Sequence, residues 1–194
     1  MGSRAGYCLI ELAAAIGISA AIAAAAVPQV LVTVDDSRAL GAARYVAARL
    51  YDTRMEALTR STHVAMRFAF NGSAYEYTVY QDGNGNGVLA RDIRSGADTA
   101  IRTVERLPDR FGGVDFGALP GLPPVDPSSA SPGSDPIRLG SSDMVSFTAA
   151  GACTTGTLYI RGKGTAQYAV VIYGDTGRIR VMKYEAPGGR WRPL

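Results

Sequence analysis

The sequence predicts an α+β protein in which one long N-terminal helix is packed on a mostly antiparallel β-sheet. Three observations predict this class. Residues 6–34 are almost wholly apolar, residues 35–61 place apolar side chains at helical spacing, and after residue 63 the period changes from 3.6 to 2. Helical and strand patterns that are segregated along a chain are typical of α+β domains.

The stretch from Gly6 to Val34 is longer than the roughly 20 residues that a helix needs to cross a bilayer. Glu11 is its only charged residue. A secretory signal has a small-residue cleavage site after its apolar region, whereas Gly6 stands before this one. Because a charge inside a membrane helix costs at least about 2.5 kcal/mol, Glu11 needs a partner. The nearest candidate is the α-amino group that cleavage after Gly6 would create on Tyr7.

Residues 35–61 continue the helix as an amphipathic segment, and we expect a bend near Pro28. One face should pack on a domain while the other meets solvent. The apolar face is formed by Leu40, Ala43, Val46, Ala47, Leu50, Ala57 and Leu58, and the polar face by Arg38, Arg49, Asp52, Glu56 and Arg60. Arg54 lies on the apolar side and breaks the pattern.

Residues 63–194 are expected to be rich in β-structure. Alternation from Val64 to Phe70, followed by Asn71-Gly72, predicts a hairpin into a second strand. Later strands are expected at Thr99–Leu107, Met144–Thr148, Thr157–Arg161, Gln167–Tyr173 and Arg178–Tyr184. Residues 111–142 are dominated by Gly, Pro and Ser, so we expect a long flexible surface loop without regular structure there.

Residues 81–98 form a glycine-punctuated loop that is rich in carboxylate and amide oxygens. Its first half resembles a calcium loop, in which every second oxygen faces one hard cation. The expected ligands are Asp82, Asn84, Asn86, the carbonyl of Val88 and Asp92. The second half departs from that pattern, because Ile93 occupies the twelfth position. An exposed Asn-Gly turn is therefore the competing interpretation, and both remain open.

The net charge, the cysteines and the lack of catalytic motifs limit the classes of function that the sequence supports. The chain of 194 residues has a formal net charge of +3, so bulk charge does not predict nucleic-acid binding. Cys8 and Cys153 fall in different predicted regions and are not expected to pair. The sole histidine, His63, has no spaced metal ligands around it, and no phosphate loop or nucleophile motif is present. We expect no enzymatic activity and no small-molecule substrate.

The start of the apolar stretch resembles the class III signal of type IV prepilins and type II secretion pseudopilins, usually G-[FY]-T-L-I-E-L. The resemblance is carried by Gly6, Tyr7, Leu9, Ile10, Glu11 and Leu12. Cys8 stands where that pattern prefers Thr or Ser, and Pro28 falls where these helices commonly kink. Three later stretches are similar to the GspH/FimT group of minor pseudopilins and pilins: Phe147-Thr-Ala-Ala-Gly151, Gly156-Thr-Leu-Tyr-Ile160 and Thr176-Gly-Arg-Ile-Arg-Val181.

The resemblance implies a type IV pilin-like fold and a minor structural subunit near the tip or in the initiation complex of a filament. Prepilin peptidase would remove residues 1–6 and Tyr7 would be methylated. Residues 7–34 would span the bacterial inner membrane once, with residues 35–194 in the periplasm. After assembly, Glu11 would neutralise the amine of Tyr7 or of a neighbouring subunit. A type II secretion pseudopilus and a type IV pilus both remain open.

The basic C-terminal stretch supports an alternative function, uptake of DNA. Arg178 and Arg180 share one face of a predicted strand, and Arg190, Trp191 and Arg192 follow. Guanidinium groups bind phosphate oxygens and an indole stacks on unpaired bases. Gly177-Arg-Ile-Arg180 and Gly189-Arg-Trp-Arg192 both resemble the G-R-x-R motif of DNA-binding FimT-type minor pilins. Ordinary solvated arginines are the competing interpretation.

Overall fold

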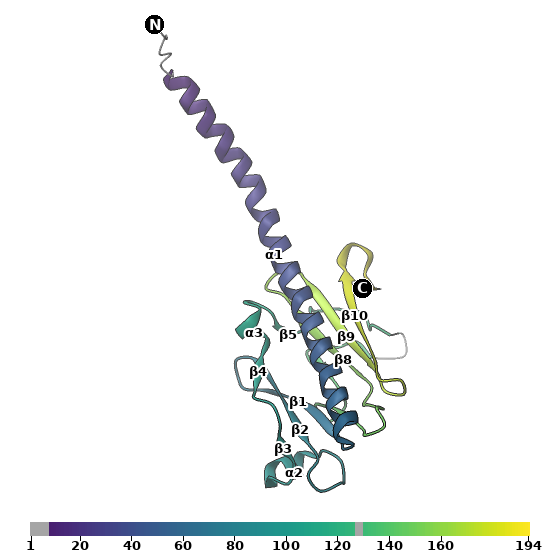
Figure 1. The fold of residues 1–194 in the computed structure, drawn as a ribbon. Helices are drawn as coiled ribbons and strands as arrows, with labels where there is room; N and C mark the ends of the chain where they lie inside the picture. Colours follow the sequence, from purple (N-terminus) through teal and green to yellow (C-terminus); the bar gives the residue numbers. More distant parts are fainter. Residues whose placement is uncertain (1–7, 127–129) are drawn as a thin grey trace. The chain divides into compact units, whose positions relative to one another are not determined.

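The computed structural model describes residues 8–126 and 130–194 (Figure 1). The chain divides into two units, residues 1–34 and residues 35–194. Gly6 and Tyr7, the residues of the predicted cleavage and methylation site, lie outside the described residues, as does the rest of the predicted leader.

The first element is α1, which extends from Leu9 to Arg60 and contributes to both units. Helix continues through Pro28, although proline has no N–H to donate to the carbonyl of Ala24. Within the second unit, one face of α1 is buried. This face is formed mostly by alanines, whose small side chains bring the helix backbone close to the sheets; its members are Ala39, Ala42, Ala43, Val46, Ala47, Leu50, Thr53 and Ala57.

The amphipathic pattern predicted five residues of this face and missed Ala39, Ala42 and Thr53, which are also buried. Leu58, expected on the buried side, lies in the last turn of α1 and is 38% exposed. Arg54, which broke the pattern, is half-buried and donates through Nη1 to the carbonyl of Gly177 at 3.3 Å.

The first sheet has the strand order β3-β2-β1-β7, and β4 also pairs with β2. All its pairings are antiparallel. The predicted hairpin is confirmed: the side-chain oxygen of Asn71 accepts the N–H groups of Ser73 and Ala74, and Gly72 has φ 95°. The strands are β1 (Val64–Phe70), β2 (Tyr75–Gln81), β3 (Thr99–Ala100), β4 (Glu105–Arg106) and β7 (Met144–Phe147).

The second sheet has the order β11-β10-β9-β8-β5, and β6 also pairs with β8. Its pairings are antiparallel too. The strands are β5 (Asp115–Phe116), β6 (Ile137–Arg138), β8 (Gly156–Arg161), β9 (Gln167–Tyr173), β10 (Arg178–Glu185) and β11 (Arg190–Pro193), with a short 3₁₀ turn η1 (Ala186–Gly188) between the last two.

One hydrophobic core joins the buried face of α1 to both sheets. From the second sheet, alternate residues enter this core, among them Leu158 and Ile160 of β8 and Val170 and Ile172 of β9. Their neighbours along each strand therefore point to the opposite face of the sheet. Figure 1 shows β8, β9 and β10 side by side, with the second half of α1 lying across them. The predicted α+β class, a long helix packed on antiparallel sheet structure, is confirmed.

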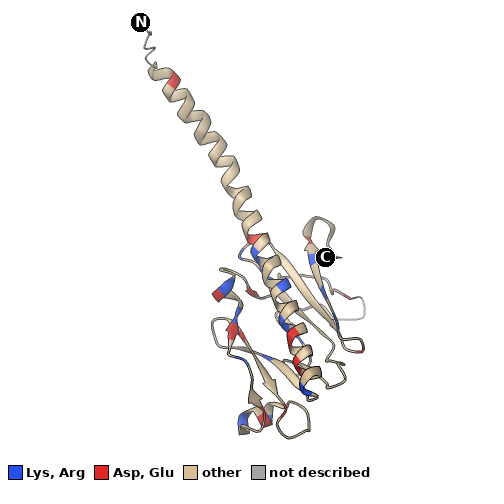
Figure 2. Ribbon diagram, viewed as in Figure 1, with Lys and Arg blue, Asp and Glu red and all other residues tan. Residues whose placement is uncertain are grey.

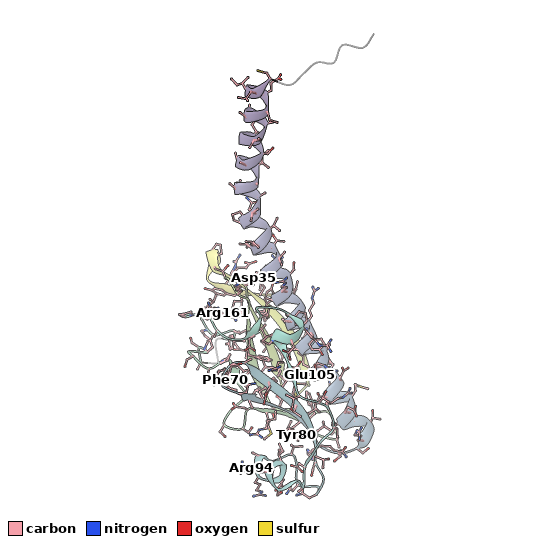
Figure 3. All side chains as sticks on the ribbon, turned by 90° about the vertical axis from the view of Figure 1, so that its left-hand side faces the viewer. Asp35, Phe70, Tyr80, Arg94, Glu105 and Arg161 are labelled. Carbon is pink, nitrogen blue, oxygen red and sulfur yellow. The ribbon has the colours of Figure 1, made fainter. Side chains whose placement is uncertain are left out.

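Several local predictions were wrong. The strands form two sheets, whereas one was expected. The loop after β2 contains a short helix, α2 (Ala90–Ser95). The single strand expected at Thr99–Leu107 is two short strands, β3 and β4, followed by α3 (Leu107–Arg110). Glu105 of β4 pairs with Tyr77 of β2, and its side chain contacts Arg49 of α1 (Figure 3).

The prediction that residues 111–142 have no regular structure was also wrong. β5 and β6 both come from this stretch and both pair with β8. Its apolar residues are scattered among Gly and Pro, yet several are buried, namely Val114, Phe116, Leu122, Ile137 and Leu139. The composition hid these contacts because a two-residue strand leaves no periodic pattern in the sequence.

Candidate functional site

The part of α1 in the first unit is the largest exposed apolar surface that the structure describes. Every residue from Cys8 to Val34 is exposed, including Leu9 at 85% and Leu31 at 64%. Figure 2 shows this length of helix as uncharged apart from one acidic band near its start, which is Glu11. Within the described residues, α1 is the one helix long and apolar enough to cross a membrane. We call residues 8–34 the apolar segment.

Three polar side chains of the apolar segment, those of Glu11, Ser19 and Thr33, have partners within that segment. The carboxylate of Glu11 accepts the backbone N–H of Cys8 at 3.0 Å, which supplies an acceptor to one of the unpaired donors at the helix start. The hydroxyls of Ser19 and Thr33 donate to carbonyls four residues earlier, at 2.8 and 2.9 Å. These bonds lower the cost of placing the segment in a medium without water.

Two aspartates bind α1 to the second sheet where the second unit begins. Asp35 accepts the N–H groups of Lys163 and Gly164, in the β8–β9 turn, at 2.7 and 2.9 Å (Figure 3). Asp36 accepts the hydroxyl of Tyr168 and the ammonium group of Lys183, both at 2.8 Å. Burial and the bond to Asp36 raise the pKa of Tyr168, so its hydroxyl stays a donor. The four contacts attach the helix to β9, β10 and a turn.

Glu105 binds α1 to the first sheet in a similar way. Its carboxylate accepts the hydroxyls of Tyr45 and Tyr77, and it forms an ion pair with Arg49 of α1. The side chains of Arg49 and Glu105 are 24% and 17% exposed, so the pair is largely shielded from water. Burial by itself raises the pKa of Glu105, but the hydrogen bonds from Tyr45, Arg49 and Tyr77 and the charge of Arg49 outweigh it and lower the pKa.

The loop predicted to bind calcium is folded around two buried carboxylates. Asp82 accepts the N–H groups of Asn84, Gly85 and Gly87 at 2.8 to 3.0 Å. Burial raises the pKa of Asp82, but these backbone donors outweigh it and lower the pKa. Asp98 accepts the N–H groups of Gly83 and Leu89 at 3.2 and 2.9 Å. The loop therefore has a defined shape that is made by its own side chains.

Three of the expected calcium ligands converge in this loop. The amide groups of Asn84 and Asn86 both donate to Oδ2 of Asp92, at 3.3 and 3.0 Å. Turning the two amides end for end would direct their oxygens to the same point. Within residues 8–126 and 130–194, no cluster of three or more His, Cys, Asp or Glu side chains could hold a metal, so calcium would depend on these amide oxygens. Calcium binding stays a prediction.

Calcium binding predicts that the full chain in detergent melts at a higher temperature with calcium chloride than with excess chelator, because the ion stabilises only the folded loop. Asp92→Asn should remove the difference while leaving the melting temperature in chelator nearly unchanged, since the Asp92 carboxylate accepts the side-chain amides of Asn84 and Asn86 and an Asn in its place still offers them an acceptor oxygen. Equal melting temperatures of the unaltered chain under the two conditions would rule the site out.

The arginines of the C-terminal strands have different surroundings. Arg190 and Arg192 of β11 both lie near Glu185, at 3.6 and 3.5 Å. Arg178 and Arg180 of β10 are exposed, and within the described residues no carboxylate lies within 4.0 Å of either guanidinium group. Sequence alone could not make this distinction, because both pairs occur in the same short motif.

Trp191 has contacts that restrict it. Its indole N–H donates to the carbonyl of Pro123 at 3.0 Å, and its ring packs on Tyr159 and Tyr184 at centroid distances of 5.8 and 5.3 Å. It closes a small apolar cluster that also holds Leu122. This cluster covers one end of the sheet face that points away from α1, so stacking of Trp191 on a base would require that cluster to open.

Comparison with known proteins leaves the family open. No protein-family model and no curated protein matches the sequence. A solved structure, that of the minor pseudopilin EPSH from the type II secretion system of Vibrio cholerae, is similar over 82% of this chain and 94% of its own. The sequence identity is 15% and the TM-score is 0.40.

Proposed function

We propose that this protein is a structural subunit that is held in the bacterial inner membrane by the apolar segment and assembles through α1 into a thin filament, a type II secretion pseudopilus or a type IV pilus. The observation that carries the proposal is the apolar segment itself. It is wholly exposed, it joins a folded domain, and its one charge lies one turn from its start.

The exposed surface of this segment requires a covering. Burying one Leu or Ile side chain stabilises by roughly 1.5–3 kcal/mol, and the segment exposes many of them, including Leu9, Ile10, Ile16 and Ile22. Lipid provides the cover before assembly and the helices of other subunits provide it afterwards. Because both surroundings are apolar, the same residues serve in each, and the domain of residues 35–194 is displayed outward.

The finer parts of the proposal come from the family resemblance of the sequence. Prepilin peptidase cleaves after Gly6, and the new amino group on Tyr7 is methylated. Glu11 then pairs with that amine in the same chain or in a neighbour, in place of the N–H of Cys8 that it accepts in the uncleaved chain. The similarity to the GspH/FimT group supports a minor subunit near the filament tip, with its folded domain in the periplasm.

Processing tests this proposal directly. In a bacterium that has the secretion or pilus machinery, we expect the mature chain to begin at Tyr7 and to appear in the sheared surface fraction. In a matched strain without prepilin peptidase, the chain should retain residues 1–6 and stay in the inner membrane. Mass spectrometry of the purified chain distinguishes the two forms. A membrane chain that still begins at Met1 in the complete strain contradicts the proposal.

A further inference from the structure

A groove crosses the face of the second sheet that points away from α1. It has two neighbouring parts, with volumes of about 460 and 410 Å³, and both are lined by Thr155 and Tyr173. The first part also holds Arg178 and Arg180 of β10, and the second holds Arg138 of β6. Ile179, between the two β10 arginines, is buried in the core on the α1 side, which fixes the direction of its neighbours.

The strand register arranges the lining in rows. Arg138 faces Thr157, Thr157 faces Val171, and Val171 faces Arg180, so these residues cross β6, β8, β9 and β10 on one face. Three strand spacings make this row about 14 Å long, the length of about four extended residues. At the far end of the sheet the same face is covered by the Trp191 cluster.

Charge in the groove is uneven. Arg138 has an ion pair with Asp135 at 3.6 Å, whereas Arg178 and Arg180 are without a carboxylate within 4.0 Å in the described part of the chain. An arginine can bind a carboxylate through two parallel N–H groups. In an exposed arginine that has no carboxylate beside it, both N–H groups are available to a ligand. The end of the groove on β10 is therefore complementary to a group with negative charge.

The carboxylates that line the groove help to distinguish two possible anionic ligands, a nucleic acid and an acidic polypeptide. Asp126 and Asp135 line the second part and Asp175 lines the first. A nucleic acid carries a phosphate at every step and would meet these carboxylates along its path. A polypeptide can place its acidic side chains only beside Arg178 and Arg180, where the two arginines outnumber Asp175, and its backbone finds hydroxyl donors in Thr155 and Thr157. The mixed charge thus favours a polypeptide.

We propose that this groove binds an extended acidic segment of a protein partner, about four residues long, whose carboxylates contact Arg178 and Arg180 while its backbone crosses β9 and β8 toward Arg138. The groove lies wholly within residues 35–194 and does not depend on the proposed filament role. It adds an interaction surface on the side of the domain that α1 leaves open.

The test uses the full chain in detergent and a hexapeptide, Glu-Glu-Thr-Val-Thr-Gly, with a fluorescent label at its C-terminal end. Fluorescence anisotropy should show saturable binding, which is absent when both glutamates of the peptide are glutamine. Arg178→Gln together with Arg180→Gln should weaken binding about tenfold or more. The control is Arg190→Gln together with Arg192→Gln, which removes the same amount of positive charge from the neighbouring strand. It should leave the affinity for the peptide within about twofold of the unaltered chain.

Three results would overturn the proposal: no saturable binding of the acidic peptide, equal losses in the two double variants, or tighter binding of a labelled six-nucleotide single strand that is lost with Arg178 and Arg180. The last result would assign the groove to DNA. Because all four arginines are exposed, we expect unchanged melting temperatures for both variants, so failure to fold does not enter the comparison.

Discussion

Glu11→Ala is expected to leave the protein in the inner membrane and to remove it from filaments. Glu11 is the only charge in the apolar segment. Removing it makes insertion easier by about 2.5 kcal/mol on insertion scales, so anchoring should be at least as good as before. Assembly should fail because helices packed in an apolar medium are oriented by their few polar contacts. Without Glu11, the α-amino group of Tyr7 in a neighbouring subunit would have no carboxylate to pair with. We expect a decrease of at least tenfold in the sheared filament fraction.

Two further variants separate charge from general damage to the helix. Glu11→Gln keeps the shape of the side chain and its acceptor for the Cys8 N–H but removes the charge, so it should fail like alanine. Ser19→Ala also removes a polar group from the apolar segment, where the hydroxyl donates only to Ala15, and it should assemble normally. Immunoblots of membrane and sheared fractions measure both. Normal filament levels of Glu11→Gln would contradict a role for the charge.

Glu105→Ala is expected to lower the free energy of unfolding of the folded domain by about 2–3 kcal/mol. It leaves the shielded guanidinium group of Arg49 without its acid, and it removes the acceptor of the Tyr45 and Tyr77 hydroxyls. A urea titration of the full chain in detergent, followed by Trp191 fluorescence, measures the loss. Glu76→Ala, on β2 near the Asn71 turn, is a control: its half-buried carboxylate accepts one side-chain amide, that of Asn71, and the change should cost less than about 0.5 kcal/mol.

The same contact predicts a pH dependence. The pKa of Glu105 is lowered from its ordinary value of 4.5 in the folded state. The unfolded chain therefore takes up a proton first as the pH falls, and the stabilisation from Glu105 is fully present above about pH 4.5 and is lost as the pH falls through the lowered value. The difference in unfolding free energy between the unaltered chain and Glu105→Gln should shrink on going from pH 7 to pH 3.5. A difference that is constant over that range would show that the charge of Glu105 does not stabilise the fold.

Local patterns predicted the elements that are long and regular. The periodicity of residues 35–61 predicted Ala43, Ala47 and Ala57 among the buried alanines of α1, and Asn71-Gly72 predicted the β1–β2 hairpin, because both patterns are local. β8, β9 and β10 were also predicted to within about one residue at each end, since each is at least six residues long. Short elements were missed: α2, β5, β6 and β11 contain between two and six residues.

The contacts that organise the domain join residues far apart in the sequence. Tyr45 and Glu105 are separated by 60 positions, and Asp36 and Lys183 by 147. Nothing in the neighbourhood of Asp36 or Glu105 indicates those partners, because a carboxylate on a helix or a loop is equally consistent with solvent. Likewise, Gly177-Arg-Ile-Arg180 and Gly189-Arg-Trp-Arg192 are equivalent as motifs until the fold places Glu185 beside the second.

The sequence alone therefore determined the long helix, its apolar segment with Glu11, the α+β class and the main strands, because hydrophobic periodicity and turn residues are local properties. Only the tertiary structure decided that the strands form two sheets, and that Asp35, Asp36 and Glu105 attach α1 to them. It also placed Arg178 and Arg180 beside a groove, with no carboxylate of the described residues within 4.0 Å. These depend on which distant side chains meet, and that is set by the packing of one core around the buried face of α1.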